Sequence, residues 1–135
     1  MNKLTQFQRL SREYFNAAEI LYSSSSGDFS NPLLFLYLHS VELLLKAKIL
    51  SCLEFIGLPE DFSRYEKLHD LGMLFEGYFL LEREPVQNLI ESETIQFLAS
   101  IDSKSTAFRY PKSLKVSPEI SQVRQCCLEV WKVLS

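Results

Sequence analysis

The sequence has few of the residues that build the commonest enzyme sites. Its 135 residues include two histidines, three cysteines and four glycines. Two histidines are too few for a histidine-rich metal centre, and the sequence contains no glycine-rich phosphate loop and no Gly-x-Ser-x-Gly nucleophile elbow. No two cysteines have the Cys-x-x-Cys spacing of a metal site. The sequence therefore disfavours the classical enzyme classes and predicts neither a metal nor a cofactor.

The cysteines also bear on the compartment of the protein. Cys126 and Cys127 are adjacent and Cys52 is the third, so a disulfide framework would leave one thiol over. The N-terminal residues reach Arg9 without the apolar segment of a signal peptide. The most apolar run, residues 33–38, is far shorter than the roughly 20 residues that span a bilayer. We therefore expect a cytoplasmic protein that has no contact with a membrane.

The sequence has no excess of positive charge. It has 14 Lys and Arg residues against 17 Asp and Glu residues, which gives a net charge of -3. Any contact with nucleic acid would need a local basic patch. The hydrophobic share of 47% and the charged share of 23% are typical of a folded domain. We expect residues 1–135 to form a single domain.

Five segments have apolar residues at the three- and four-residue steps of a helix. They cover roughly residues 4–22, 32–56, 63–81, 85–101 and 118–134. Gly57 and Pro59 are expected to end the second of them. No long segment alternates with the period of a strand, and short connections favour antiparallel neighbours. The sequence therefore predicts an all-α fold, an antiparallel up-and-down helical bundle of about five helices.

The second predicted helix has a polar stripe on an otherwise apolar rod. His39, Glu42 and Lys46 follow one another at steps of three and four residues, which puts them on one face. Such a stripe is expected to face water or a cleft. In one interpretation it is a solvated edge with an ion pair between Glu42 and Lys46. In the other it is the wall of a pocket, where Lys46 faces an anionic ligand and His39 lies near the opening.

A second candidate site is the pair Arg64 and His69. A guanidinium can hold a phosphate while an imidazole moves a proton, which is a combination that can cleave RNA without a metal. On one regular helix the two residues would lie about 140° apart, so they converge only with a turn at Arg64. Alternatively, His69 and Asp70 fix the start of a helix. Ser63 and Glu66 match a capping box, which predicts that the third helix begins at Ser63.

The longest predicted loop, residues 102–117, contains a third candidate. Arg109 stands between Phe108 and Tyr110. An arginine flanked by aromatic residues can hold an anion and stack on a base. In the alternative interpretation the two aromatic residues fasten the loop to the core and Arg109 is solvated.

Three segments together resemble the HEPN domain (higher eukaryotes and prokaryotes nucleotide-binding). They are His39-Ser40-Val41-Glu42-Leu43-Leu44-Leu45-Lys46-Ala47, His69-Asp70-Leu71 and Phe108-Arg109-Tyr110-Pro111, in this order. The resemblance covers essentially the whole chain and implies an antiparallel helical bundle. It also implies a homodimer and, as in many bacterial and archaeal members, a small nucleotidyltransferase as partner in a toxin-antitoxin pair.

The resemblance implies a function as well. A HEPN-like binding module would hold a nucleotide, RNA or a protein partner in a polar groove. The groove residues would be His39, Glu42, Lys46, His69, Arg109 and Tyr110. Active family members cut RNA with an arginine and a histidine four to six residues apart, which is a spacing that Arg64 and His69 meet. The alternatives are thus a metal-independent endoribonuclease, where Arg64 positions the phosphate and His69 is general acid or base, and a structural helical subunit.

Overall fold

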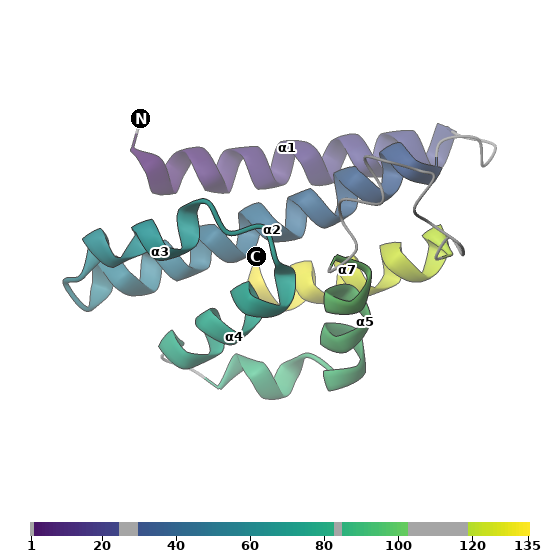
Figure 1. Ribbon diagram of the computed structural model, residues 1–135. Helices are drawn as coiled ribbons and strands as arrows, with labels where there is room; N and C mark the ends of the chain where they lie inside the picture. The colour runs from purple at the N-terminus through teal and green to yellow at the C-terminus, as the bar shows by residue number, and fades with distance from the viewer. Residues whose placement is uncertain (1, 25–29, 83–84, 103–118) are drawn as a thin grey trace.

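The computed structural model describes residues 2–24, 30–82, 85–102 and 119–135. This part of the chain consists of six α-helices and two 3-10 helices and contains no strand (Figure 1). In chain order the elements are α1 (Lys3–Ser24), α2 (Ser30–Phe55), η1 (Pro59–Phe62), α3 (Ser63–Glu66), α4 (Leu71–Leu81), η2 (Val86–Leu89), α5 (Ser92–Asp102) and α7 (Ile120–Leu134). The all-α helical bundle predicted from the sequence is confirmed.

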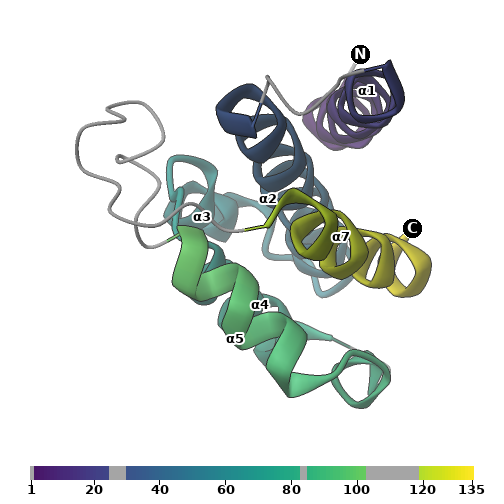
Figure 2. The ribbon, with the colours of Figure 1, turned by 90° about the vertical axis from the view of Figure 1, so that its right-hand side faces the viewer.

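The helix α2 is the centre of the bundle. α1 lies along one side of it, and α4 and α7 pack against other sides (Figure 1 and Figure 2). Buried residues occur around its whole circumference, among them Leu33, Val41, Leu45, Ala47, Leu50 and Leu53. A helix that is apolar on all sides needs neighbours on all sides. Within the described ranges, no helix combines the length and the apolar character needed to cross a membrane.

The first and last helices agree with their apolar patterns. α1 slightly exceeds the predicted range 4–22 at both ends. α7 begins at Ile120, close to the predicted start. Its predicted apolar face consists of Ile120, Val123, Cys127, Val130 and Leu134, and all of these except the half-buried Ile120 are buried.

The C-terminal end of α2 lies where the glycine predicts it. Gly57 has a φ of 79°, in the left-handed region that a residue with a Cβ rarely adopts. The Leu58 amide donates to the Leu53 carbonyl over 2.9 Å, and the Gly57 amide donates to the Glu54 carbonyl over 3.2 Å. This pair of hydrogen bonds closes the helix as a Schellman motif.

The prediction of one continuous third helix over residues 63–81 is wrong. α3 ends at Glu66, and α4 begins after Asp70, whose Oδ1 accepts from the Met73 amide over 3.0 Å. The predicted capping box at Ser63 is also wrong. η1 already occupies the preceding turn, so Ser63 has helical φ and ψ of -55° and -25° rather than the extended backbone of an N-cap. The interpretation of the His69-Asp70 segment as a helix start is confirmed through Asp70.

The helix observed in place of the fourth predicted helix, residues 85–101, is shorter than predicted. The first turn of the predicted range is the 3-10 helix η2, and Ile90 follows with extended φ and ψ of -112° and 128°. Ile90 is buried in the core in this conformation. α5 therefore begins only at Ser92.

Two glycines allow close packing on both sides of α4. A Cβ on Gly77 would lie 2.6 Å from Cε1 of Tyr65, a residue of α3. A Cβ on Gly72 would lie 3.3 Å from the Cβ of Ala99, a residue of α5. Glycine lowers helix propensity, but here the missing side chains let α3 and α5 approach α4.

A polar cluster joins α1, α2 and α7. Arg124 donates from Nε to Oε2 of Glu19 over 2.7 Å and from Nη2 to Oε1 over 3.2 Å. The hydroxyl of Tyr37, a buried residue of α2, donates to the same Oε2 over 2.7 Å. The Arg124 guanidinium also lies 4.9 Å from the ring centre of Tyr22. Because a bidentate pair has a fixed geometry, this cluster sets the relative positions of three helices.

The cluster shifts the pKa of its members. Burial alone would raise the pKa of the Glu19 carboxyl, but the hydrogen bonds from Arg124 and Tyr37 and the charge of Arg124 hold it below the usual 4.5. Burial, together with the hydrogen bond to Glu19, raises the pKa of Tyr37 far above its ordinary value. Glu19 is therefore ionised at neutral pH, and its charge stabilises the folded state.

We expect Glu19→Gln to lower the free energy of unfolding by about 1.5 to 3 kcal/mol at neutral pH, which is the usual contribution of hydrogen bonds to a charged group. Since the folded-state pKa of Glu19 lies below 4.5, this stabilisation is fully present above that pH and is lost as the pH falls through the folded-state pKa. Urea unfolding followed by circular dichroism, at neutral pH and in acid, measures the difference between the two proteins. A difference that does not shrink in acid would contradict the ionised cluster.

Candidate functional site

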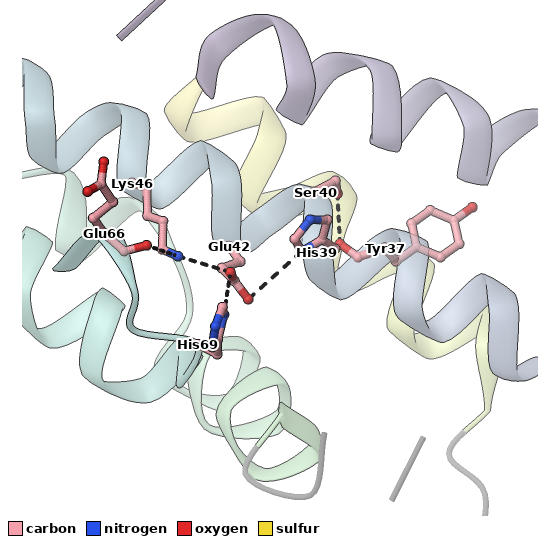
Figure 3. A network of polar contacts seen from close by, with 7 residues as sticks. All are labelled: Tyr37, His39, Ser40, Glu42, Lys46, Glu66 and His69. Atoms are coloured by element: carbon pink, nitrogen blue, oxygen red, sulfur yellow. Dashed lines mark hydrogen bonds and ion pairs between the residues drawn. The ribbon is translucent and has the colours of Figure 1, made fainter. Parts of the chain in front are cut away.

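One carboxylate of α2 has three cationic or imidazole side chains around it. Oε2 of Glu42 accepts from Nζ of Lys46 over 3.1 Å and lies 3.1 Å from Nδ1 of His69. Oε1 of Glu42 lies 4.0 Å from Nδ1 of His39. In Figure 3 the three side chains converge on Glu42, and His69 reaches it from the segment that follows α3. We call these four residues the carboxylate cluster. It unites four of the six ligand-binding residues that the sequence predicts.

The polar stripe of α2 is covered by protein. The side chains of Glu42 and Lys46 are only 8% and 3% exposed, so the expectation that the stripe faces water or a cleft is wrong for both. Their predicted ion pair is confirmed. α3 covers Lys46, because the carbonyl of its last residue, Glu66, accepts from Nζ of Lys46 over 2.8 Å. A buried ammonium is stable only with such partners.

His69 is the member of the cluster that faces solvent. Its side chain is 63% exposed, although Nδ1 contacts the buried carboxylate of Glu42. A carboxylate at one ring nitrogen orients an imidazole and favours the proton on that nitrogen. Nε2, on the other side of the ring, is then the nitrogen that a ligand can reach. It accepts a hydrogen bond when the ring is neutral and donates one to an anion when both nitrogens carry protons.

His39 lies between two aromatic rings at the other end of the cluster. Its ring stacks on Phe35 with 5.2 Å between centroids and 13° between planes. Tyr14 of α1 meets it edge-on at 4.6 Å and 86°. No sequence pattern indicates the second contact, because Tyr14 lies on another helix. The spacing of Phe35 and His39, four positions apart on α2, is the one signal that was available.

The other predicted site residues are placed differently. Arg64 is an exposed residue of α3, and the chain leaves that helix at Lys67, before His69. The two residues of the predicted ribonuclease pair are thus not on one regular helix. Arg109 and Tyr110 belong to residues 103–118 and lie outside the described part of the chain.

Cysteine and metal chemistry find little support in the part of the chain described. All three cysteines are free thiols. Burial raises the pKa of Cys127, and burial together with the charge of Glu129 raises that of Cys126, so neither is an activated thiolate. Among the described residues, no three or more His, Cys, Asp and Glu side chains form a group that could hold a metal ion.

A separate basic groove lies between α1, α2 and the end of α7. It has a volume of about 490 Å³, and Arg9, Arg12 and Lys48 are among the residues that line it. Lys48 is two positions after Lys46, which on a helix is about 200° around the axis. The basic groove therefore faces away from the carboxylate cluster, and its residues serve as controls for it.

Comparison of the chain with protein-family models, with curated proteins and with solved structures finds no match.

We expect Lys46→Met to lower the free energy of unfolding by about 3 to 5 kcal/mol, because it leaves the buried carboxylate of Glu42 without its ammonium partner. Urea unfolding measures the loss. Lys48→Met, on another face of the same helix, is the matched control and should cost less than about 1 kcal/mol. The double variant Glu42→Leu/Lys46→Met should recover part of the loss, since it removes both charges. If the loss in the double variant equals the sum of the losses in Glu42→Leu and Lys46→Met, the two residues are not a coupled buried pair.

Proposed function

We propose that this chain is a HEPN-like binding module that holds the phosphate of a nucleotide or of RNA at His69. One observation carries the proposal: an exposed imidazole is held at one nitrogen by a buried carboxylate. The arrangement supports anion binding because Glu42 is already paired with Lys46 and holds Nδ1 of the His69 ring, which leaves Nε2 on the side away from the carboxylate. When both ring nitrogens carry protons, a phosphate at Nε2 meets a hydrogen-bond donor.

The remaining predicted residues have supporting roles in this proposal. Lys46 acts through Glu42, since its ammonium already contacts that carboxylate and the Glu66 carbonyl. His39 is the second imidazole beside the carboxylate. Arg109 and Tyr110 are assigned to anion binding and stacking by the resemblance alone.

The partners are also part of the proposal. We infer from the resemblance that the chain forms a homodimer in the cytoplasm and pairs with a nucleotidyltransferase-like protein in a toxin-antitoxin type system. Three free thiols are compatible with a reducing compartment. If the module binds only a protein partner, or is a structural subunit, calorimetric titration with nucleotides gives no heat.

Calorimetric titration with ATP, with GTP and with a short single-stranded RNA tests the binding function. We expect His69→Ala to weaken the affinity about tenfold or more, since it removes a hydrogen bond to the charged phosphate, which contributes about 1.5 to 3 kcal/mol. The fold should tolerate this change because the side chain is mostly exposed. Arg12→Ala in the basic groove is the control and should leave the affinity unchanged. Binding that depends on Arg12 and not on His69 would move the site to that groove.

A second candidate function is metal-independent cleavage of RNA. The observation that favours it is the pairing of His69 with the carboxylate of Glu42, which is the usual way to orient an imidazole that transfers protons. In this hypothesis Arg64 holds the scissile phosphate and His69 acts as general acid or base. Arg64 lies within α3 and His69 follows the end of that helix, so the turn between the two residues comes after Arg64 rather than at it.

Incubation of the protein with total RNA in the presence of a chelator tests this second function. If the protein is a ribonuclease, we expect cleavage that falls at least about a hundredfold in His69→Ala, because general acid-base catalysis contributes roughly 10² to 10⁴. Arg64→Ala should also reduce cleavage, whereas Arg9→Ala should not. An RNA ladder that is the same with and without the wild-type protein would leave only the binding function.

A further inference from the structure

The carboxylate cluster continues into an aromatic surface on the same face of α2. Phe35, His39, Glu42 and Lys46 follow one another at steps of four, three and four residues, so they form one stripe along the helix. The later half of this stripe is ionic and largely buried. Its earlier half is aromatic and partly open to solvent.

The aromatic half of the stripe contains two stacked rings that a further flat ring could extend. The rings of Phe35 and His39 are nearly parallel, at 13°, while Tyr14 closes the side of His39 edge-on. Phe35 remains 39% exposed, whereas Phe62 and Phe75 are buried in the core. The contact between Tyr14 and His39 already packs α1 against α2. Tyr14 also meets Phe35 edge-on, at 6.5 Å and 78°, so part of Phe35 packs against α1. The part of the Phe35 ring that remains exposed is open to a ligand with a flat ring.

The distance along the helix suits one nucleotide. With a rise of about 1.5 Å per residue, His39 is about 5 Å and Phe35 about 10 Å from Glu42 along the axis. A base stacked on these rings would thus have the exposed imidazole of His69, at Glu42, within reach of its own or a neighbouring phosphate.

We propose that Tyr14, Phe35 and His39 form a stacking platform for the base of a nucleotide or of single-stranded RNA whose phosphate lies at His69. The inference rests on the proposed function and adds the part of the ligand that is recognised. Every base has a π-face, so a platform of this kind can bind RNA of any sequence, and it favours the large rings of purines. It also requires an unpaired base, which makes single-stranded rather than double-stranded RNA the substrate class.

The test compares two oligomers of equal length and charge, single-stranded oligo(A) and an abasic ribose-phosphate chain. We expect wild-type protein to bind oligo(A) about tenfold more tightly, a difference of about 1.4 kcal/mol. Phe35→Leu should abolish the preference and leave the affinity for the abasic chain unchanged. Phe35→Tyr, which restores a ring, should keep the preference. Phe55→Leu, at an exposed phenylalanine near the other end of α2, is the matched control and should behave as wild type.

The outcomes separate this inference from the proposed function. Equal affinity of the wild-type protein for both oligomers would overturn the platform and leave phosphate binding at His69 in place. A preference for oligo(A) that survives in Phe35→Leu would also overturn the platform. Failure of the wild-type protein to bind either oligomer would overturn the proposed function together with the platform.

Discussion

The arrangement of this bundle around its candidate site depends on the buried ion pair between Glu42 and Lys46. A buried pair contributes little net stability, because the cost of removing two charges from water offsets their attraction. Here the buried pair fixes the position of the segment that covers it. The Lys46 ammonium requires a further acceptor and finds it in the Glu66 carbonyl, and the Glu42 carboxylate fixes the ring of His69. The turn between α3 and α4 is thereby held against α2.

A second polar cluster lies on the opposite side of the central helix. Tyr37 presents a hydroxyl to Glu19, which holds Arg124 in a bidentate pair, so α1 and α7 are aligned on α2 by polar contacts. Apart from Lys48 and Ser51 at the basic groove, most of the remaining α2 surface is apolar, and apolar contacts have little directional preference. A helix that is apolar all round could slide or rotate among its neighbours, and each polar cluster excludes most of these alternatives. The two clusters together explain why so hydrophobic a helix has one set of neighbours.

The fold was predictable from the sequence as far as local rules apply. Apolar periodicity predicted α1, α2 and α7, and Gly57 predicted the end of α2. The third helix was predicted as continuous because its apolar spacing runs on through residues 67–70, where the chain leaves α3 and Asp70 caps α4. The capping box failed because it is a local pattern, and the preceding turn η1 had already set the backbone of Ser63. The burial of Lys46 was not predictable in the same way. Its decisive acceptor is a backbone carbonyl, which every residue has, and only the tertiary position of α3 brings that carbonyl close.

The burial of the ionic residues also decides which groups can meet a ligand. Spacing along α2 made Lys46 the obvious anion contact, but its ammonium is enclosed and already has two acceptors. Among the residues of the stripe and of the carboxylate cluster, the groups that keep exposed surface are the imidazoles of His39 and His69 and the ring of Phe35. Charge is thus held in the interior, where it orients the imidazoles, and the surface is aromatic. A surface of this composition suits a flat ring joined to an anion better than an anion alone, because stacking supplies the contact area that a single imidazole lacks.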